Sequence, residues 1–233
     1  MMTFSDLGGM AWELTHIFGE KVHLLPLDSG PYAAMAYPRW LPLMKFRVQW
    51  YAGPGYGNVF AMHTRALGGR MELATLVFTP NAGGDVPLLL VDVMAMGKKR
   101  AAFVEYYDCT KGGAPRGAMA EVTAKFQHLP DYPEKPAWYV ARRTPDSLIK
   151  GGAGADGNAL CAMLAASVEA YGENCRAHTE AREENRAGLG AFIEQMLRQG
   201  NPASATLERV LGKAGAEGFF RTLVMPETYI TKI

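Results

Sequence analysis

The feature that most constrains this sequence is one acidic residue, Asp92, inside an otherwise apolar run at residues 86–96. The run is too short to cross a membrane as a helix. Glycines flank it on both sides, and a short apolar run between turn residues favours a buried strand. Side chains alternate between the two faces of a strand, so one face carries a defined set. That set is Leu88, Leu90, Asp92, Met94 and Met96.

A carboxylate on a buried strand is unfavourable unless it is paired, hydrogen-bonded or protonated. Burial raises the pKa of a carboxyl group, and a raised pKa suits a proton donor that works near neutral pH. A structural acid, hydrogen-bonded to a nearby backbone or side-chain group, explains the pattern as well. The sequence pattern leaves both interpretations of Asp92 open.

Composition and charge limit the class of protein. The 233 residues are enough for one large core or two small ones. The formal net charge is +1, which gives no reason to expect a nucleic-acid or membrane partner. The three cysteines have no metal-like spacing and predict free thiols in a reducing compartment such as the cytoplasm. The first residues lack the basic and apolar regions of a secretory signal.

The first half of the chain reads as a series of strands. Residues 45–51 alternate cleanly between apolar and polar side chains, which predicts a half-buried strand. Short connections that contain glycine separate the strands, and they favour antiparallel pairing because a parallel crossover needs a helix. Further strands are expected at residues 59–67, 72–78, 87–96 and 101–107.

The second half reads as helices. A helical stripe of Leu189, Phe192, Ile193, Met196 and Leu197 is spaced by three and four residues. Strands followed by helices predict an α+β fold, with a central antiparallel sheet covered by helices. Other helices are expected at residues 1–20, 117–127, from 158 onward and around 207–211. Residues 138–141 are expected to form a last strand or an extended segment, and 151–157 a loop, while 21–44 receive no assignment.

Two groups of residues together resemble a known family. The first group is Phe78-Thr79-Pro80, Val86-Pro87-Leu88, Asp92 and Ala101-Ala102-Phe103. The second group is Gln199-Gly200-Asn201, residues 206–212, residues 216–220 and Leu223-Val224-Met225. In their order and spacing these segments resemble the ferredoxin-dependent bilin reductases. With the elements between them, they cover most of residues 45–226.

The resemblance implies a fold and a reaction. The fold would be a single α/β/α sandwich over residues 1–233, with the bilin between the sheet and the C-terminal helices. The reaction would reduce a linear tetrapyrrole, biliverdin or a dihydrobiliverdin, to a phycobilin by a radical mechanism. A ferredoxin would supply single electrons and protein acids the protons, with no flavin or metal bound. We expect a cytoplasmic monomer with no nucleic-acid or membrane partner.

The resemblance also assigns residues to the reaction. Asp92 occupies the central proton-donor position. Thr75 stands where the family often has a histidine, and it can hydrogen-bond but donates protons poorly. His63 occupies a position that is a glutamate in some members and can titrate near neutral pH; a short gap would place Arg65 there instead. A surface histidine is an equally good interpretation of His63.

Binding of the two bilin propionates needs cationic or hydrogen-bonding partners, and arginine suits a carboxylate well. By resemblance these partners are Arg100 and Arg142, although each also fits a surface arginine. The residues 98–100 can instead steer an acidic ferredoxin, and they fit an ordinary charged hairpin tip equally well. Asn201 matches the family's closing motif, but the acid that usually follows it is missing. Glu105 is a possible compensating acid or an ordinary ion-paired glutamate.

The missing acid favours a two-electron over a four-electron reduction. It also keeps two other functions open. One is a tetrapyrrole-binding carrier or sensor without reductase activity. The other is a reductase for a different open-chain tetrapyrrole, such as a chlorophyll breakdown product.

Overall fold

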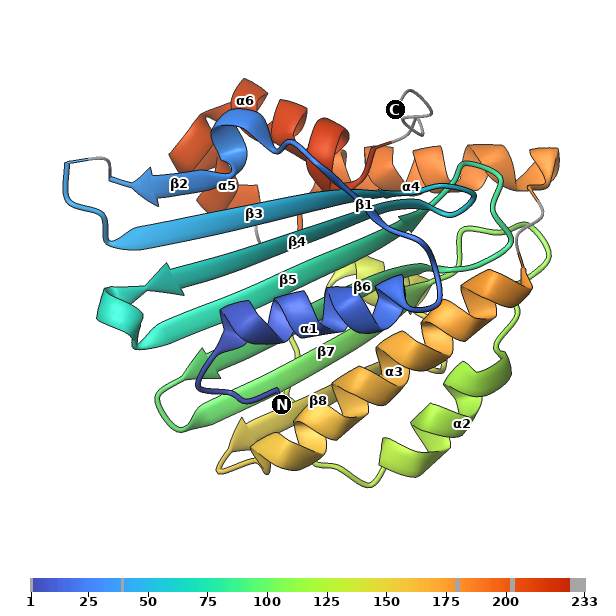
Figure 1. Cartoon of the computed structure of the whole chain (residues 1–233), viewed down its shortest axis with the longest axis horizontal. Coiled ribbons are helices and arrows are strands. Elements are labelled where there is room, and N and C mark those ends of the chain that lie inside the picture. Colours follow the sequence, from blue (N-terminus) through green and yellow to red (C-terminus); the bar gives the residue numbers. More distant parts are fainter. Residues whose placement is uncertain (1, 39, 179–180, 202–203, 227–233) are drawn as a thin grey trace.

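An antiparallel sheet of eight strands forms the middle layer of the computed structural model, which describes residues 2–38, 40–178, 181–201 and 204–226. Helices cover both faces of this sheet (Figure 1). The structure therefore confirms the predicted α+β fold. The strands are β1 (Leu25–Leu27), β2 (Ala34–Tyr37), β3 (Met44–Gly53), β4 (Gly57–Ala66), β5 (Met71–Pro80), β6 (Leu88–Met96), β7 (Lys99–Tyr107) and β8 (Leu148–Ala153).

The strands follow one another in the sheet in the order β1-β3-β4-β5-β6-β7-β8, and β2 pairs with β3 beside β1. All the pairs between these strands are antiparallel, as the short glycine-containing connections predict. Strand β6 lies between β5 and β7, near the middle of the sheet. The run around Asp92 is therefore an interior strand whose backbone groups pair on both sides.

One face of the sheet is covered by α1 (Leu7–Gly19) and α3 (Gly157–Ala177), with α2 (Gly117–Phe126) beside α3 (Figure 1). An aspartate caps the first turn of α1 and of α3. Asp6 accepts a hydrogen bond from the Gly9 N–H at 2.8 Å, and Asp156 accepts one from the Asn158 N–H at 2.9 Å. Such caps satisfy backbone donors that have no partner inside the helix.

The other face is covered by the C-terminal elements α4 (Arg186–Gln199), α5 (Ser204–Leu211), α6 (Lys213–Phe219) and the π-helical turn η5 (Phe220–Val224). The predicted stripe on α4 is real, because Leu189, Phe192, Ile193 and Met196 are all buried. Short 3-10 turns complete the fold. They are η1 (Gly30–Tyr32), η2 (Leu67–Gly69), η3 (Trp138–Arg142) and η4 (Glu183–Asn185). None of the described helices combines the length and the apolar character that crossing a lipid bilayer needs.

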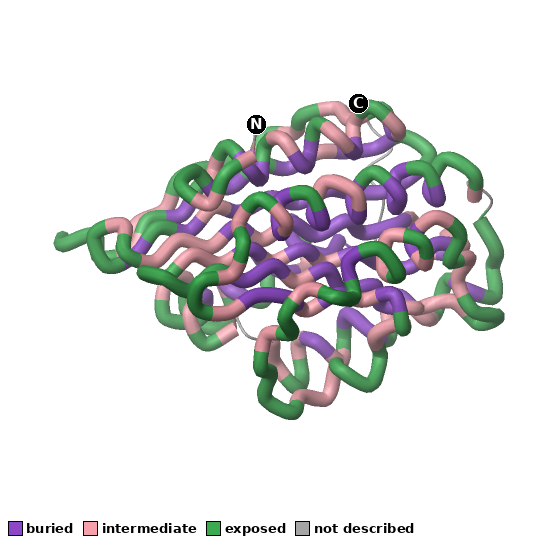
Figure 2. The backbone as a smooth tube through the Cα atoms, turned by 90° about the horizontal axis from the view of Figure 1, so that it is seen from below, coloured by how far each residue is buried: buried purple, intermediate pink, exposed green. Residues whose placement is uncertain are grey.

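Both faces of the sheet are buried, so the molecule has a core on each side of it. Figure 2 shows the buried segments concentrated in the interior, inside an exposed periphery. In β6, Val91 and Val93 join the core under α1 and α3, while Leu88 and Leu90 face the core under the C-terminal helices. This double burial explains why the strand is apolar at nearly every position.

Two expectations from the sequence are wrong. Residues 138–142 form the 3-10 turn η3 and not an extended segment, and the expected loop at 151–157 begins inside the edge strand β8. In addition, the unassigned residues 21–44 contain β1, η1 and β2. Strand β8 is short and contains Gly151 and Gly152 before its last residue, so it lacks the alternation by which a strand is recognised.

Candidate functional site

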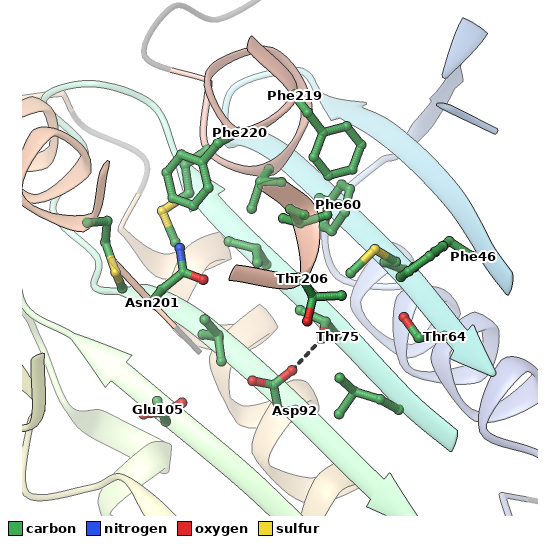
Figure 3. A pocket seen from close by; sticks show the side chains of 18 of the residues that line it. Phe46, Phe60, Thr64, Thr75, Asp92, Glu105, Asn201, Thr206, Phe219 and Phe220 are labelled. Carbon is green, nitrogen blue, oxygen red and sulfur yellow. Dashed lines mark hydrogen bonds between the residues drawn. The ribbon is translucent and has the colours of Figure 1, made fainter. Parts of the chain in front are cut away.

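A cavity lies between the sheet and the C-terminal helices (Figure 3). Strands β3 to β7 form its floor, and α4, α5, α6 and η5 supply its roof. Its surface is mainly apolar, and methionines and phenylalanines make up much of it. The neutral polar residues in the lining are Thr64, Thr75, Tyr107, Tyr139, Asn201 and Thr206. The lining also holds two carboxyl groups, those of Asp92 and Glu105.

Asp92 points from β6 into this cavity, and Thr75 lies directly opposite it on β5. The Thr75 hydroxyl donates a hydrogen bond to Asp92 Oδ1 at 2.5 Å, marked by the dashed line in Figure 3. Opposed residues on adjacent antiparallel strands share a face, so the register itself brings the two side chains together. The structure thus places Asp92 and Thr75, both predicted site residues, in one cavity.

The surroundings of Asp92 change its acidity. Burial is the main cause that raises its pKa, the Thr75 hydrogen bond opposes the rise, and the negative charge of Glu105 adds to it. The resulting pKa is about 7, well above the ordinary 3.8. The side chain is only half-buried by its accessible area, because the cavity opens onto it. A carboxyl group with this pKa and this access can both donate and regain a proton near neutral pH.

Glu105 belongs to β7 and is buried in the cavity wall, 5% exposed. Its Oε1 accepts hydrogen bonds from the Tyr107 hydroxyl at 2.7 Å and from Arg143 Nε at 2.5 Å. Arg143 also holds Glu134 through two bonds of 2.7 and 2.8 Å. Burial raises the pKa of Glu105, while the Arg143 charge and the bonds from Tyr107 and Arg143 lower it. The ion-paired interpretation of Glu105 is confirmed.

Asn201 reaches the cavity from the opposite side, at the connection between α4 and α5. Its backbone N–H donates to Ser204 Oγ at 2.9 Å, which fixes the start of α5. Thr206 lies one turn further on and also lines the cavity. Figure 3 shows Asn201 and Thr206 among the side chains around the cavity that also holds Asp92 and Thr75.

His63 and Arg65 do not lie in this cavity. Both come from β4, but their side chains are on the α1 face of the sheet. There Glu72 binds both, with His63 Nε2 at 3.3 Å from its Oε2 and Arg65 Nε at 3.0 Å from its Oε1. The position of His63 gives no support to a catalytic role beside Asp92, and the position of Arg65 gives none to substrate binding.

Arg100 and Arg142 also lie outside the cavity lining. Arg100 is on the α3 face of β7, where its Nη1 donates to the Ala155 carbonyl at 3.4 Å and its guanidinium lies over the Phe4 ring. Arg142 ends η3 on the exposed surface, and its Nη2 donates to Gln195 Oε1 at 3.3 Å. The described structure therefore brings neither predicted propionate partner to the cavity.

Several residues of the site were not found from the sequence. Tyr107, Tyr139, Thr64 and Thr206 line the cavity, and Arg143 holds its acidic wall. Thr64 shares a strand face with Phe60 and Met62, and Tyr107 shares one with Glu105, so alternation along each expected strand gives a signal for them. Arg143 has no comparable signal, because its partners Glu105 and Glu134 are brought to it only by the fold.

Comparison with solved structures places this fold among known ones. It is similar to the crystal structure of phytochromobilin synthase from tomato in complex with biliverdin, with a TM-score of 0.75. The match covers 95% of this chain and 83% of that chain, at 12% sequence identity. No family model matches the sequence, and neither does any curated protein. The two proteins share a fold, at an identity too low to carry residue roles from one to the other.

Proposed function

We propose that this protein binds a linear tetrapyrrole in the cavity and reduces it, with Asp92 as a proton donor. The observation that carries the proposal is the Asp92 carboxyl group, which has a pKa of about 7 and faces an apolar cavity. The similarity of the fold to a synthase crystallised with biliverdin supports the choice of ligand. The sequence segments that resemble those of the bilin reductases support it as well. An apolar cavity with a few placed polar groups is typical of such a site.

The chemistry required of the chain is modest. A two-electron reduction adds two electrons and two protons to the conjugated system, and the electrons come singly from a reduced one-electron donor such as a ferredoxin. Thr75 occupies Asp92 Oδ1, which leaves Oδ2 to carry and donate a proton. Once ionised, Asp92 regains a proton from solvent through the open cavity. The product would be a phycobilin, and no bound flavin or metal takes part in the proposed sequence.

The test combines binding and turnover. The protein is mixed with biliverdin, the absorption spectrum is recorded, and reduced ferredoxin is added without oxygen. We expect a spectral shift on binding and a second shift on reduction, and Asp92→Asn should keep the first and lose or redirect the second. The absence of any shift with biliverdin contradicts the proposal, and an unchanged rate and product in Asp92→Asn contradict the role of Asp92.

The second candidate is a tetrapyrrole-binding carrier or sensor without reductase activity. The observation in its favour is the composition of the site. The direct partner of Asp92 is Thr75, a poor proton donor, and Glu105 forms an ion pair with Arg143. The same experiment separates the two functions, because a carrier shows the first spectral shift and no turnover with any reduced one-electron donor.

A further inference from the structure

One end of the sheet gathers the connections between its strands, on the left in Figure 1. The strands β3 to β8 end in register there, and the residues that pair in turn are Met44, Ala66, Met71, Met96, Lys99 and Ala153. Neighbouring connections also share backbone hydrogen bonds, as from the Leu67 N–H to the Leu43 carbonyl at 3.2 Å. The connections therefore form one continuous surface. We call it the loop edge and define it as residues 40–45, 65–72, 96–100 and 153–157.

The loop edge exposes large apolar side chains. Among the described residues eight large apolar side chains are exposed, and five of these belong to the loop edge. They are Trp40, Leu41, Leu43, Leu67 and Met96. Trp40 is 83% exposed and Leu67 is 62% exposed, so neither contributes much to the core. Single exposed apolar residues need no explanation, but a group of them on one surface marks an interaction site.

The same surface is positively charged. It carries six cations and two acids, a net charge of +4, whereas the net charge of the whole chain is +1. The cations are Lys45, Arg65, Arg70, Lys98, Lys99 and Arg100. Both acids already have partners, since Glu72 binds Arg65 and Asp156 caps α3. The small net charge of the chain, from which no membrane partner was expected, thus conceals a local excess of positive charge.

We infer that the loop edge docks the protein onto an anionic lipid surface. Apolar side chains enter the interfacial layer of a bilayer, and neighbouring lysines and arginines attract its anionic headgroups. Trp40 suits this layer because tryptophan is enriched where a membrane meets water. The apolar side chains are carried on turns at the strand ends, and a fluid bilayer accepts them without a complementary shape. Such docking is peripheral and needs no membrane-spanning helix.

Two kinds of protein partner suit the loop edge less well. A second copy of the chain would bring another net charge of +4 against it, and like charges oppose such a contact. An acidic protein suits the cations, but it gives no reason for the exposed Trp40 and Leu67.

The inference goes beyond the proposed function, because it concerns a different surface and holds whatever the cavity binds. The two surfaces meet at Met44 and Met71, which line the cavity and belong to the loop edge. Docking would therefore hold this end of the cavity next to the bilayer.

Sedimentation with lipid vesicles tests the inference without any tetrapyrrole. The protein is mixed with vesicles of phosphatidylcholine alone, or of phosphatidylcholine and phosphatidylglycerol in equal parts. At low salt we expect binding to the mixed vesicles and at least about tenfold weaker binding to phosphatidylcholine alone. High salt should release the protein, because it screens the charges. A protein that does not sediment with the mixed vesicles, or that binds both kinds equally, overturns the inference.

Two matched pairs of variants locate the contact. Trp40→Ser removes an exposed tryptophan of the loop edge, and Trp12→Ser removes one that is 55% exposed on α1. Lys99→Glu reverses a charge of the loop edge, and Lys111→Glu reverses an exposed charge beyond the opposite end of β7. We expect Trp40→Ser and Lys99→Glu each to weaken binding to the mixed vesicles severalfold, and the two controls to leave it unchanged.

The variants also separate lipid from protein partners. All four positions are exposed, so the circular dichroism spectrum of each variant should stay that of the wild type. Controls that weaken binding as much as Trp40→Ser and Lys99→Glu place the contact elsewhere and overturn the inference. It is also overturned if the wild type ignores the vesicles but dimerises, or binds an acidic ferredoxin, in a way that Trp40→Ser abolishes.

Discussion

Asp92 shows how far a single residue can be interpreted from a sequence. An acid among apolar neighbours predicts burial and a raised pKa, and the structure has both. The partner of Asp92 follows less directly, since Thr75 is identified only through the pairing of β5 with β6. The ion pair of Glu105 with Arg143 is out of reach for sequence reasoning, because 38 positions separate the two residues.

The raised pKa of Asp92 predicts how the stability of the fold depends on pH. The folded state holds this proton up to about pH 7, while the unfolded chain releases it near 3.8. The free energy of unfolding therefore falls as the pH rises from about 4 to about 7. Asp92→Asn lacks the titrating group and should not lose stability in this way. Between about pH 5 and 8 its free energy of unfolding should rise by roughly 2 kcal/mol relative to that of the wild type, after allowance for solvent access.

Urea denaturation of both proteins at the two pH values measures this gain. Wild type should lose stability between the lower and the higher pH relative to Asp92→Asn, because only wild type carries the titrating group. A difference between the two proteins that is the same at both pH values would show that Asp92 ionises in the folded state as easily as in the unfolded chain.

Substitutions of two neighbours of Asp92, Thr75 and Glu105, should shift the pKa of Asp92 in opposite directions. Thr75→Val removes a hydrogen bond that favours the ionised carboxylate, so the pKa of Asp92 should rise above 7. Glu105→Gln removes a nearby negative charge, so the same pKa should fall. The carbon-13 NMR titration of the Asp92 carboxyl group reads both shifts. Shifts of the same sign in the two variants would contradict this account of its environment.

At the scale of elements, the sequence predicts regular strands well and the edge strand β8 poorly. The interior strands β5 to β7 carry apolar residues on both faces, and β3 alternates between apolar and polar side chains. Both signals are strong over residues 45–107. Strand β8 reads as a loop because Gly151 and Gly152 dominate its end. The structure gives Gly151 a local reason, since its position against β7 leaves no room for a side chain.

Substitution of the two glycines of β8 separates the effect of crowding from that of backbone conformation. Both have positive φ angles, 141° for Gly151 and 147° for Gly152, so alanine is strained at either position. A Cβ atom at Gly151 would lie 2.3 Å from the Arg100 carbonyl oxygen, whereas one at Gly152 meets nothing within 4 Å. Gly151→Ala should therefore destabilise the protein by at least about 1 kcal/mol more than Gly152→Ala.

Thermal unfolding of the two variants tests this order. Gly152→Ala is the control, because it carries the backbone strain without the clash against β7. Equal melting temperatures would mean that the edge pairing of β7 with β8 relaxes to accept a side chain.

At the scale of the whole molecule, the two faces of the sheet differ in what they pack against. The α1 and α3 face carries one continuous core, and the cavity that holds Asp92 lies on the face of the C-terminal helices. A gapless match to the resembled family gave His63 a catalytic position together with Asp92. The register of β4 against β5, however, decides which face of the sheet each side chain occupies. In the structure Met62 pairs with Thr75, so Met62 faces the cavity and His63 faces away. A one-residue change of register exchanges the faces, and the sequence does not fix it.

This division of the sheet predicts opposite results for two consecutive residues of β4. Thr64 lines the cavity, while His63 contacts Glu72 on the other face. Thr64→Met places a larger apolar side chain in the cavity and should weaken binding of biliverdin severalfold. His63→Met makes the same kind of change one position earlier and should leave that affinity unchanged. Absorption titration of both variants gives the answer, and a loss of affinity in His63→Met alone would place the ligand on the α1 face of the sheet.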